Sequence, residues 1–293
     1  MGQKEQPQSP QPVLPPLRLD DWRVLFALPI LENDFSIMPT LADAAGAAGL
    51  TPFHFHRRFL ETMGETVGDY SRRIRLQRAA AMVTRTNASL LDTALRSGYA
   101  SQEAFSRAFA RQYQMTPGAL RRATFGLAPP SRPIDRDRAA LVRPVWGEPQ
   151  RLIGMRFHGD YRNVPLFWRQ FARQLHERGF SLDQARPVGV LHDDPGYTDP
   201  GRIRYDCCVL DTGLPDHLVK PPFWRTPLQE SLYAQTALQG GYGLIAETIF
   251  SICVAWLAGA RKVLSETPAY EIYRTPPWSN EDWFDLMLLV PIA

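Results

Sequence analysis

The sequence predicts a multidomain protein in which an all-α domain precedes an α+β domain. Three observations lead to this fold class. The chain has 293 residues, about twice the roughly 150 residues of a typical domain. Apolar residues recur at helical spacings of three and four up to about residue 124, whereas short β-like runs alternate with amphipathic helical runs after about residue 148. Arginine is concentrated in the first of these two parts.

Composition sets the expected boundaries. Residues 1–17 are rich in proline and glutamine, which predicts a disordered tail. Residues 125–147 hold four prolines among mixed charges, which is typical of a linker. We therefore expect folded domains at 18–124 and 148–293. A hydrophobic content of 44% with 22% charged residues is typical of globular proteins and argues against a disordered or fibrous chain.

Cysteine usage and hydropathy predict a cytoplasmic protein with no membrane partner. The three cysteines, Cys207, Cys208 and Cys253, show no C-x-x-C spacing, which favours a reduced compartment. The first residues lack the apolar core of a signal peptide. The most apolar stretch, 244–260, is interrupted by polar residues and is shorter than the roughly 20 residues that a span needs. No cofactor is expected, and no metal site.

The distribution of charge indicates a polyanionic partner for the first part only. Residues 51–122 contain twelve arginines and five acids, a balance of 12 − 5 = +7. Residues 125–293 contain eighteen basic residues and nineteen acids, a balance of 18 − 19 = −1. A basic segment of this kind favours contact with double-stranded DNA.

An internal repeat is present in the first part of the chain. Each copy contains a short helical run with small residues, a turn with glycine, and a second helix that Thr51 or Ser101 would cap. This order predicts two helix-turn-helix units, whose second helices can enter a major groove. The matched pairs at an offset of 50 residues are Phe55/Phe105, Arg57/Arg107, Phe59/Phe109, Thr66/Thr116, Gly68/Gly118 and Arg72/Arg122.

Within each second helix, the phenylalanines and the arginine have different expected roles. The two phenylalanines of a copy are i,i+4 neighbours, so we expect them to lie on one face and pack in a core. Arg57 and Arg107 fall on another face, where they are free to meet DNA. Each could also be a solvated surface residue, but the matched positions in a basic segment favour the DNA role. His54 and His56 do not share a helix face, which argues against a metal site.

The segments LADAAGAAGLTPFHFHRRFLETMG, RIRLQRAAAMV and SGYASQEAFSRAFARQYQMTPGALRR closely resemble the DNA-binding domain of AraC-type transcription regulators. The resemblance spans nearly all of residues 22–122 and implies seven helices that read two successive major-groove segments. It implies that Glu103 stands where some relatives have an amide, so the base preference of the second unit is open. The base-reading residues implied are Phe53, His56, Arg57, Gln102, Glu103, Ser106 and Arg107, and the expected phosphate contacts are Arg58, Arg72, Arg73 and Arg121.

The later segments PVGVLHDDPGYTDPGRIRYDCCVL, ALQGGYGLIAE and YEIYRTPP resemble the GyrI-like effector-binding domain over about 148–293. The resemblance implies two pseudo-symmetric strand-helix-strand halves with a cleft that admits apolar, aromatic or cationic compounds.

Met287 aligns with an acid of several relatives, and Asp285, two residues earlier, could substitute for it. Loss of the acid would favour an apolar or aromatic effector. Glu247 is a further acidic candidate, although a solvated helix position explains it equally well. The aromatic candidates are Trp168, Tyr205, Trp256 and Tyr273, each of which could instead fill a core.

These observations predict a sequence-specific, DNA-binding transcription regulator that is modulated by a small molecule and is not an enzyme. The ligand must favour one DNA-binding or polymerase-contacting state over another, which makes RNA polymerase a candidate partner. The alternative is a GyrI-like small-molecule hydrolase or sequestering protein fused to a DNA-binding domain. A third interpretation is a DNA-binding scaffold whose second domain only dimerises or recruits partners.

Overall fold

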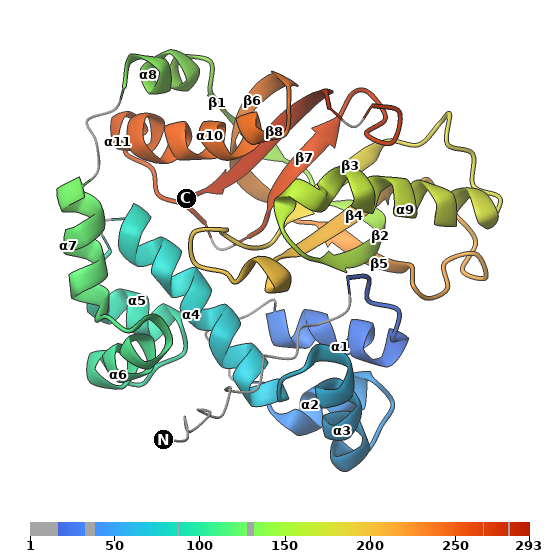
Figure 1. The fold of residues 1–293 in the computed structure, drawn as a ribbon, viewed down its shortest axis with the longest axis horizontal. Helices are drawn as coiled ribbons and strands as arrows, with labels where there is room; N and C mark the ends of the chain where they lie inside the picture. The colour runs from blue at the N-terminus through green and yellow to red at the C-terminus, as the bar shows by residue number, and fades with distance from the viewer. Residues whose placement is uncertain (1–16, 33–38, 87, 128–131, 266, 281) are drawn as a thin grey trace, which may run out of the picture.

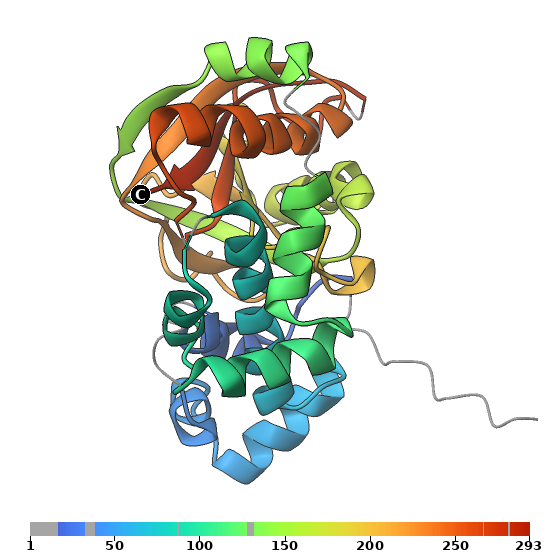
Figure 2. The same cartoon turned by 90° about the vertical axis from the view of Figure 1, so that its left-hand side faces the viewer.

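The computed structural model describes residues 17–32, 39–86, 88–127, 132–265, 267–280 and 282–293, and the expected tail lies outside this set apart from Leu17. Helices form the N-terminal part, and a curled sheet with helices forms the C-terminal part (Figures 1 and 2). The described residues include no helix that is both long and apolar enough to cross a membrane.

The N-terminal part contains the seven helices that the resemblance implies, counted over the described residues. Thr51 and Ser101 cap α3 and α6 as expected, because each side chain accepts a hydrogen bond from a backbone N–H of the first turn. Gly49 and Gly98 have φ values of 62° and 74° in the two turns, which glycine adopts without strain. The helices are α1 (Trp22–Glu32), α2 (Leu41–Ala47), α3 (Pro52–Met63), α4 (Val67–Arg85), α5 (Leu90–Arg96), α6 (Gln102–Tyr113) and α7 (Pro117–Leu127).

Helix α4 belongs to the cores of both helix-turn-helix units. Its first half contributes Tyr70 and Ile74 to a core that also holds Phe55 and Phe59 of α3. Its second half contributes Leu76, Ala79 and Val83 to a separate core that holds Phe105 and Phe109 of α6. The four phenylalanines are fully buried, which confirms their expected packing role. A single 19-residue helix therefore joins the two units.

The expected linker is largely folded. Helix α7 extends to Leu127, helix α8 occupies Pro133–Ala140, and strand β1 occupies Arg143–Gly147. Pro133 stands in the first turn of α8, where its missing N–H costs nothing. Pro133 therefore marks the start of a helix, and because β1 pairs with β6 the C-terminal sheet begins earlier than the expected residue 148.

The C-terminal part is an α+β domain around one eight-stranded antiparallel sheet. Helices α9 (Val164–Glu177), α10 (Gly243–Ser251) and α11 (Leu257–Ala260) pack on one face of the sheet, and a π-helical turn, η3 (Ile252–Trp256), joins α10 to α11. The other strands are β2 (Gln150–His158), β3 (Pro187–Leu191), β4 (Arg204–Leu210), β5 (Trp224–Leu228), β6 (Ser231–Gly240), β7 (Ala269–Tyr273) and β8 (Phe284–Ile292).

The sheet consists of two related halves. The strand order is β1-β6-β8-β7-β3-β4-β2-β5, so β2-α9-β3-β4 and β6-α10-β7-β8 repeat the same arrangement in opposite directions. Each half is thus a strand-helix-strand unit followed by one further strand. The halves meet where β3 pairs with β7, and Gly189 stands opposite Glu271 at the centre of that pairing.

Candidate functional site

The first two turns of α3 and α6 carry the residues expected to read bases. Phe53 is 71% exposed, and the side chain of Arg57 is 65% exposed with its Nε 3.7 Å from Glu61. Gln102, Glu103 and Arg107 of α6 are also exposed. His56 and Ser106 lie at the same positions of their helices and are partly buried. Both helices therefore offer an open polar face opposite their buried phenylalanines.

The four expected phosphate contacts differ in availability. Arg72 is exposed and pairs with Asp69 of its own helix at 2.6 Å. Arg58 is half-exposed, and its Nε donates to Asp21 at 2.5 Å. Arg73 is buried and ion-paired with Glu65 at 2.6 Å, so it does not face solvent where a phosphate would lie.

Arg121 has a structural contact that the sequence did not reveal. Its guanidinium donates to the carbonyl oxygens of Val83 at 3.1 Å and Ala88 at 2.7 Å. These carbonyls lie at the end of α4 and in the loop after it, so Arg121 holds α7 against that loop. Arg73 and Arg121 are therefore corrections to the phosphate set, because tertiary contacts occupy both side chains.

A cavity of about 360 Å³ lies between the α10 side of the sheet and helix α4. This volume falls within the range of about 300–1,000 Å³ that is usual for small-molecule sites. Most of the exposed wall is apolar, but charged and polar side chains, among them Arg78, Arg85, His192 and Asp193, also line the cavity. The apolar lining includes Leu191, Ile245, Ile249, Phe250, Leu264 and Val290.

Glu271 of β7 is a buried acid in the wall of this cavity. Its Oε2 accepts hydrogen bonds from the hydroxyls of Tyr205 at 2.6 Å and Tyr273 at 2.8 Å. Burial raises the pKa of Glu271 to about 7, although the two tyrosine hydrogen bonds act in the opposite direction. The carboxyl group can therefore be neutral or ionised near neutral pH, and a ligand can select either form.

The expected aromatic ligand residues lie behind this acid and not in the wall of the cavity. Tyr205 and Tyr273 orient Glu271, and Trp168 donates from its indole nitrogen to the Tyr205 hydroxyl at 3.1 Å. Trp168 and Tyr205 are fully buried in the core under α9. Trp256 lies on η3, in a shallow depression beside α8. The structure brings three of the four aromatic candidates together as support for the acid.

The expected acidic positions do not face the cavity. Glu247 is exposed on α10 and pairs with Arg138 of α8 at 2.6 Å. This is the solvated helix position that was the alternative to a ligand-binding role for Glu247. Asp285 accepts from the Gln239 amide at 2.9 Å. Leu286 and Leu288 belong to the core under the helices, so strand alternation directs Asp285 and Met287 to the opposite face.

The acid that the sequence analysis missed is Glu271, two residues before Tyr273. A charged residue inside the short apolar run AYEIY was the available signal. An acid between buried strand neighbours needs partners, and such positions are often functional. Glu271, and not Asp285, Met287 or Glu247, therefore lies in the wall of the cavity, where Asp193 and Asp194 are further acids.

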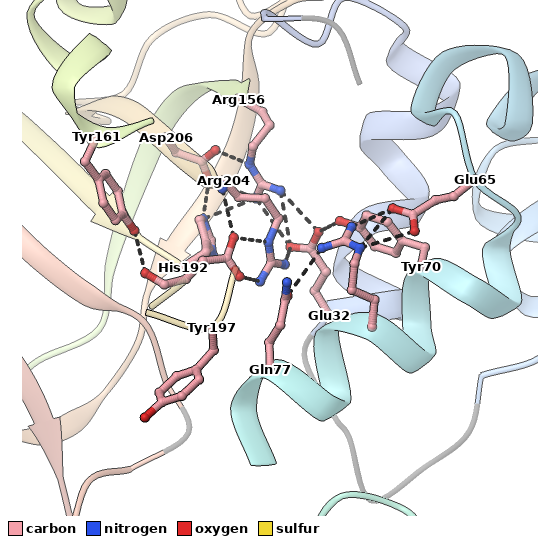
Figure 3. Close-up of polar contacts among 12 residues, drawn as sticks. Glu32, Glu65, Tyr70, Gln77, Arg156, Tyr161, His192, Tyr197, Arg204 and Asp206 are labelled. Carbon is pink, nitrogen blue, oxygen red and sulfur yellow. Dashed lines mark hydrogen bonds and ion pairs between the residues drawn. The ribbon is translucent and has the colours of Figure 1, made fainter. Parts of the chain in front are cut away.

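A buried ionic cluster joins the two parts of the chain (Figure 3). Glu32, at the end of α1, lies 3.1 Å from Arg156 of β2 and 3.1 Å from Arg204 of β4. The hydroxyl of Tyr70 on α4 also donates to Glu32. Asp193 pairs with Arg204 at 2.7 Å. These charges are buried away from water. The carboxylate of Glu32 in the N-terminal part and the guanidinium groups of Arg156 and Arg204 in the C-terminal part therefore stabilise each other across the domain boundary.

The cluster holds its carboxylates in the ionised form. Burial opposes ionisation of Glu32, but the charges of Arg156 and Arg204 hold the pKa of Glu32 well below its usual value. Burial likewise opposes ionisation of Asp206, but Arg156 and His192 lower the pKa of Asp206 to about 2. Burial, followed by the charge of Arg156, lowers the pKa of His192. The cluster therefore keeps its acids charged at neutral pH and disfavours a charged His192.

Two protein-family models match this chain. A helix-turn-helix domain matches residues 44–123, and a GyrI-like small-molecule-binding domain matches residues 142–293. The second match covers more than half of the chain, so the protein belongs to the GyrI-like family. Its N-terminal domain is a helix-turn-helix domain of the AraC type.

Individual relatives match over about a third of the chain. The chain is 36% identical over 106 residues to the transcriptional regulator Rob of Salmonella typhimurium and to the right origin-binding protein of Escherichia coli K12. In both cases the match covers 35% of this chain and 37% of the relative, so it spans about a third of each. A hydrolase from Listeria innocua superposes with a TM-score of 0.37 and 11% identity over 52% of this chain and 91% of that one.

Proposed function

We propose that this protein is a sequence-specific, DNA-binding transcription regulator whose activity depends on a small molecule in the C-terminal cavity. The observation that carries the proposal is the exposed polar face on the first two turns of α3 and of α6. Each helix is capped at its start and is held by its own pair of buried phenylalanines. A second helix exposed in this way fits the major groove. The similarity to Rob and to the right origin-binding protein supports the same function.

The proposed DNA contacts divide between bases and phosphates. Arg57 and Arg107 are exposed at matching positions, where a guanidinium can bind a guanine edge with two hydrogen bonds. Phe53, His56, Gln102, Glu103 and Ser106 lie beside them and complete the proposed base-reading surfaces. Arg72, and Arg58 if it leaves Asp21, are the proposed phosphate contacts. RNA polymerase is a proposed partner of the DNA-bound protein.

The proposed effector is an apolar or aromatic compound. Most of the cavity wall is apolar, which favours such a ligand through burial of its surface. Glu271 adds a buried polar anchor to those that Arg78 and Arg85 offer from α4. A neutral Glu271 can donate a hydrogen bond to the ligand, whereas an ionised Glu271 can pair with a cationic group. A ligand with an aromatic ring system and a single polar or basic group would contact both the apolar lining and Glu271.

Fluorescence anisotropy with a duplex selected from a random pool tests the DNA function. We expect preference over a scrambled duplex and a log–log salt slope of several units. Arg57→Ala and Arg107→Ala should each cost about 1–3 kcal/mol and relax base preference. Arg162→Ala is the matched control, because Arg162 is 88% exposed in the C-terminal part. Equal binding of selected and scrambled duplexes by the native protein would contradict the proposal.

Hydrolysis of a small electrophile is a second candidate function, and Glu271 is the observation that favours it. The ionised carboxylate of a group with a pKa of about 7 can accept a proton from water while the water oxygen bonds to an epoxide carbon and the ring C–O bond of that carbon breaks. The ring oxygen then takes a proton from solvent and remains on the product as the second hydroxyl of a diol. Mass spectrometry of an epoxide panel incubated with the protein tests this activity. Turnover that Glu271→Gln abolishes would support it, and unchanged epoxides would contradict it.

A further inference from the structure

We infer that helix α4 of the DNA-binding domain is part of the ligand-binding site, so that the ligand contacts directly the helix that carries both DNA-reading units. This inference rests on the proposed function of the cavity as an effector site. It adds residues of the N-terminal domain to a site whose other wall belongs to the GyrI-like small-molecule-binding domain, matched over residues 142–293.

One face of α4 forms a wall of the cavity. Gln77, Arg78, Ala81, Met82 and Arg85 all line it. Their spacings of one, three and four residues place them on a single side of the helix. The face is apolar at its centre, where Ala81 and Met82 lie, and basic toward Arg78 and Arg85. A ligand in the cavity therefore meets the DNA-binding domain over more than one helical turn.

The opposite wall belongs to the C-terminal domain. Ile249 and Phe250 of α10, and the loop 193–195 that follows β3, lie across the cavity from α4. Arg85 and Asp194 form an ion pair at the edge of the cavity and join the two walls there. The cavity thus lies between the two domains, and the Arg85–Asp194 ion pair connects the domains at its edge. Its ligand must touch both.

Helix α4 can transmit the effect of ligand binding in the cavity to both DNA-reading units. Its opposite faces carry Tyr70 and Ile74 into the core under α3, and Ala79 and Val83 into the core under α6. These cores are close-packed, so α4 cannot shift without moving α3 and α6. A ligand that fills the cavity adds contacts between α4 and the C-terminal domain. Ligand affinity and DNA affinity are therefore coupled, and by the same factor in each direction.

Three alanine-to-tryptophan variants of the full chain test where the ligand binds, with the uncharged apolar dye Nile red as the probe. Ala81→Trp fills the cavity from α4, and Ala246→Trp fills it from α10. Ala123→Trp is the matched control, because Ala123 is exposed on α7 outside the cavity. We expect the first two variants each to weaken dye binding tenfold or more, and the control to bind as the native protein does.

The outcomes separate this inference from the proposed function. Loss of dye binding in Ala246→Trp with native binding in Ala81→Trp would overturn the role of α4 and leave the effector cavity intact. Native binding in both variants, or no binding by the native protein, would contradict the cavity as the effector site. Thermal melting checks that each variant folds, and Ala81→Leu replaces Ala81→Trp if the larger side chain prevents folding.

Coupling is measured on the native protein with the selected duplex. We expect saturating dye to change the DNA dissociation constant about fivefold or more, and saturating DNA to change the dye dissociation constant by the same factor. Met82→Ala removes most of the apolar contact that α4 offers to the ligand, so the factor should approach one in that variant. A DNA affinity that is the same with and without bound dye would contradict transmission through α4.

Discussion

Gly189 and Glu271 stand opposite each other on β3 and β7, and the absence of a side chain at Gly189 leaves room for the carboxyl group of Glu271. A Cβ atom at Gly189 would lie 2.6 Å from Oε2 of Glu271 and 2.1 Å from the Tyr205 hydroxyl. Both distances are shorter than non-bonded atoms tolerate. The glycine therefore provides the space in which Tyr205 and Glu271 meet.

The close approach at Gly189 predicts a large effect from a single methyl group. Gly189→Ala should displace the Tyr205 hydroxyl from Glu271 and cost about 1–3 kcal/mol of stability, as overpacked cores do. Denaturant unfolding measures the loss, and dye titration should show weakened binding in the same variant. Gly46→Ala is a useful comparison for steric effects, because nothing lies within 4 Å of the Cβ position of Gly46 and its backbone is helical. Native stability and dye binding in Gly189→Ala would contradict the packing described here.

The raised pKa of Glu271 predicts how stability depends on pH. Its folded-state pKa of about 7 lies above the ordinary 4.5, so between these values the folded state retains a proton that the unfolded state has released. This contribution to stability is complete below pH 4.5 and is lost as pH rises toward 7, a change of about 3 kcal/mol. Glu271→Gln keeps an oxygen for both tyrosines and cannot ionise.

Unfolding free energies at pH 5 and pH 8 test this dependence. Relative to the native protein, Glu271→Gln should gain stability on going from pH 5 to pH 8. Tyr273→Phe is a comparison that removes one hydrogen bond and leaves the carboxyl in place. Parallel pH profiles for the native protein and Glu271→Gln would show that Glu271 does not titrate in this range.

The buried cluster at the domain boundary predicts that Glu32 is important for stability. Glu32→Ala would leave Arg156 and Arg204 buried beside each other without the acid between them. Removing one partner of a buried charge pair costs about 3–5 kcal/mol. Glu247→Ala breaks a pair in which the acid is exposed, and it should cost less than about 1 kcal/mol. Equal losses in the two variants would contradict the burial of the cluster.

Arg121 should contribute to the stability of the fold, whereas Arg72 should contribute to DNA binding. Arg121→Ala leaves the carbonyls of Val83 and Ala88 without their donor, and we expect a loss of about 1–3 kcal/mol of stability. Arg72→Ala should change stability by less than about 0.5 kcal/mol and lower the salt slope of DNA binding by about one unit. Unfolding and salt titrations on both variants measure the two effects. A salt slope that falls only in Arg121→Ala would reverse the assignment.

The helix-turn-helix units could be predicted from the sequence because their signals are local. Thr51 and Ser101 cap helices next to themselves, and Phe55 with Phe59 forms a face through i,i+4 spacing. Such relationships need no knowledge of the rest of the fold. The resemblance also identified the GyrI-like domain, which the family model matches over residues 142–293, although α8 and β1 occupy much of the segment whose prolines indicated a linker.

The cavity acid and the buried arginines could not be predicted in the same way. Whether Glu271 or Asp285 faces the helices depends on the register of β7 and β8 in the sheet, which local spacing does not determine. Arg73 is next to the exposed Arg72 in sequence, and only the contact with Glu65 distinguishes their environments. The position of α4 beside the cavity results from the packing of the two domains against each other. The local sequence of neither domain predicts that packing.

The continuous helix α4 also has a consequence for the DNA that the protein would recognise. A helix of 19 residues is about 28 Å long, and here it is packed into the core of each reading unit. The distance between α3 and α6 is then a fixed property of the protein. An operator should therefore require constant spacing between its two recognised segments, and inserting a few base pairs between them should abolish recognition of one segment even when both sequences are intact.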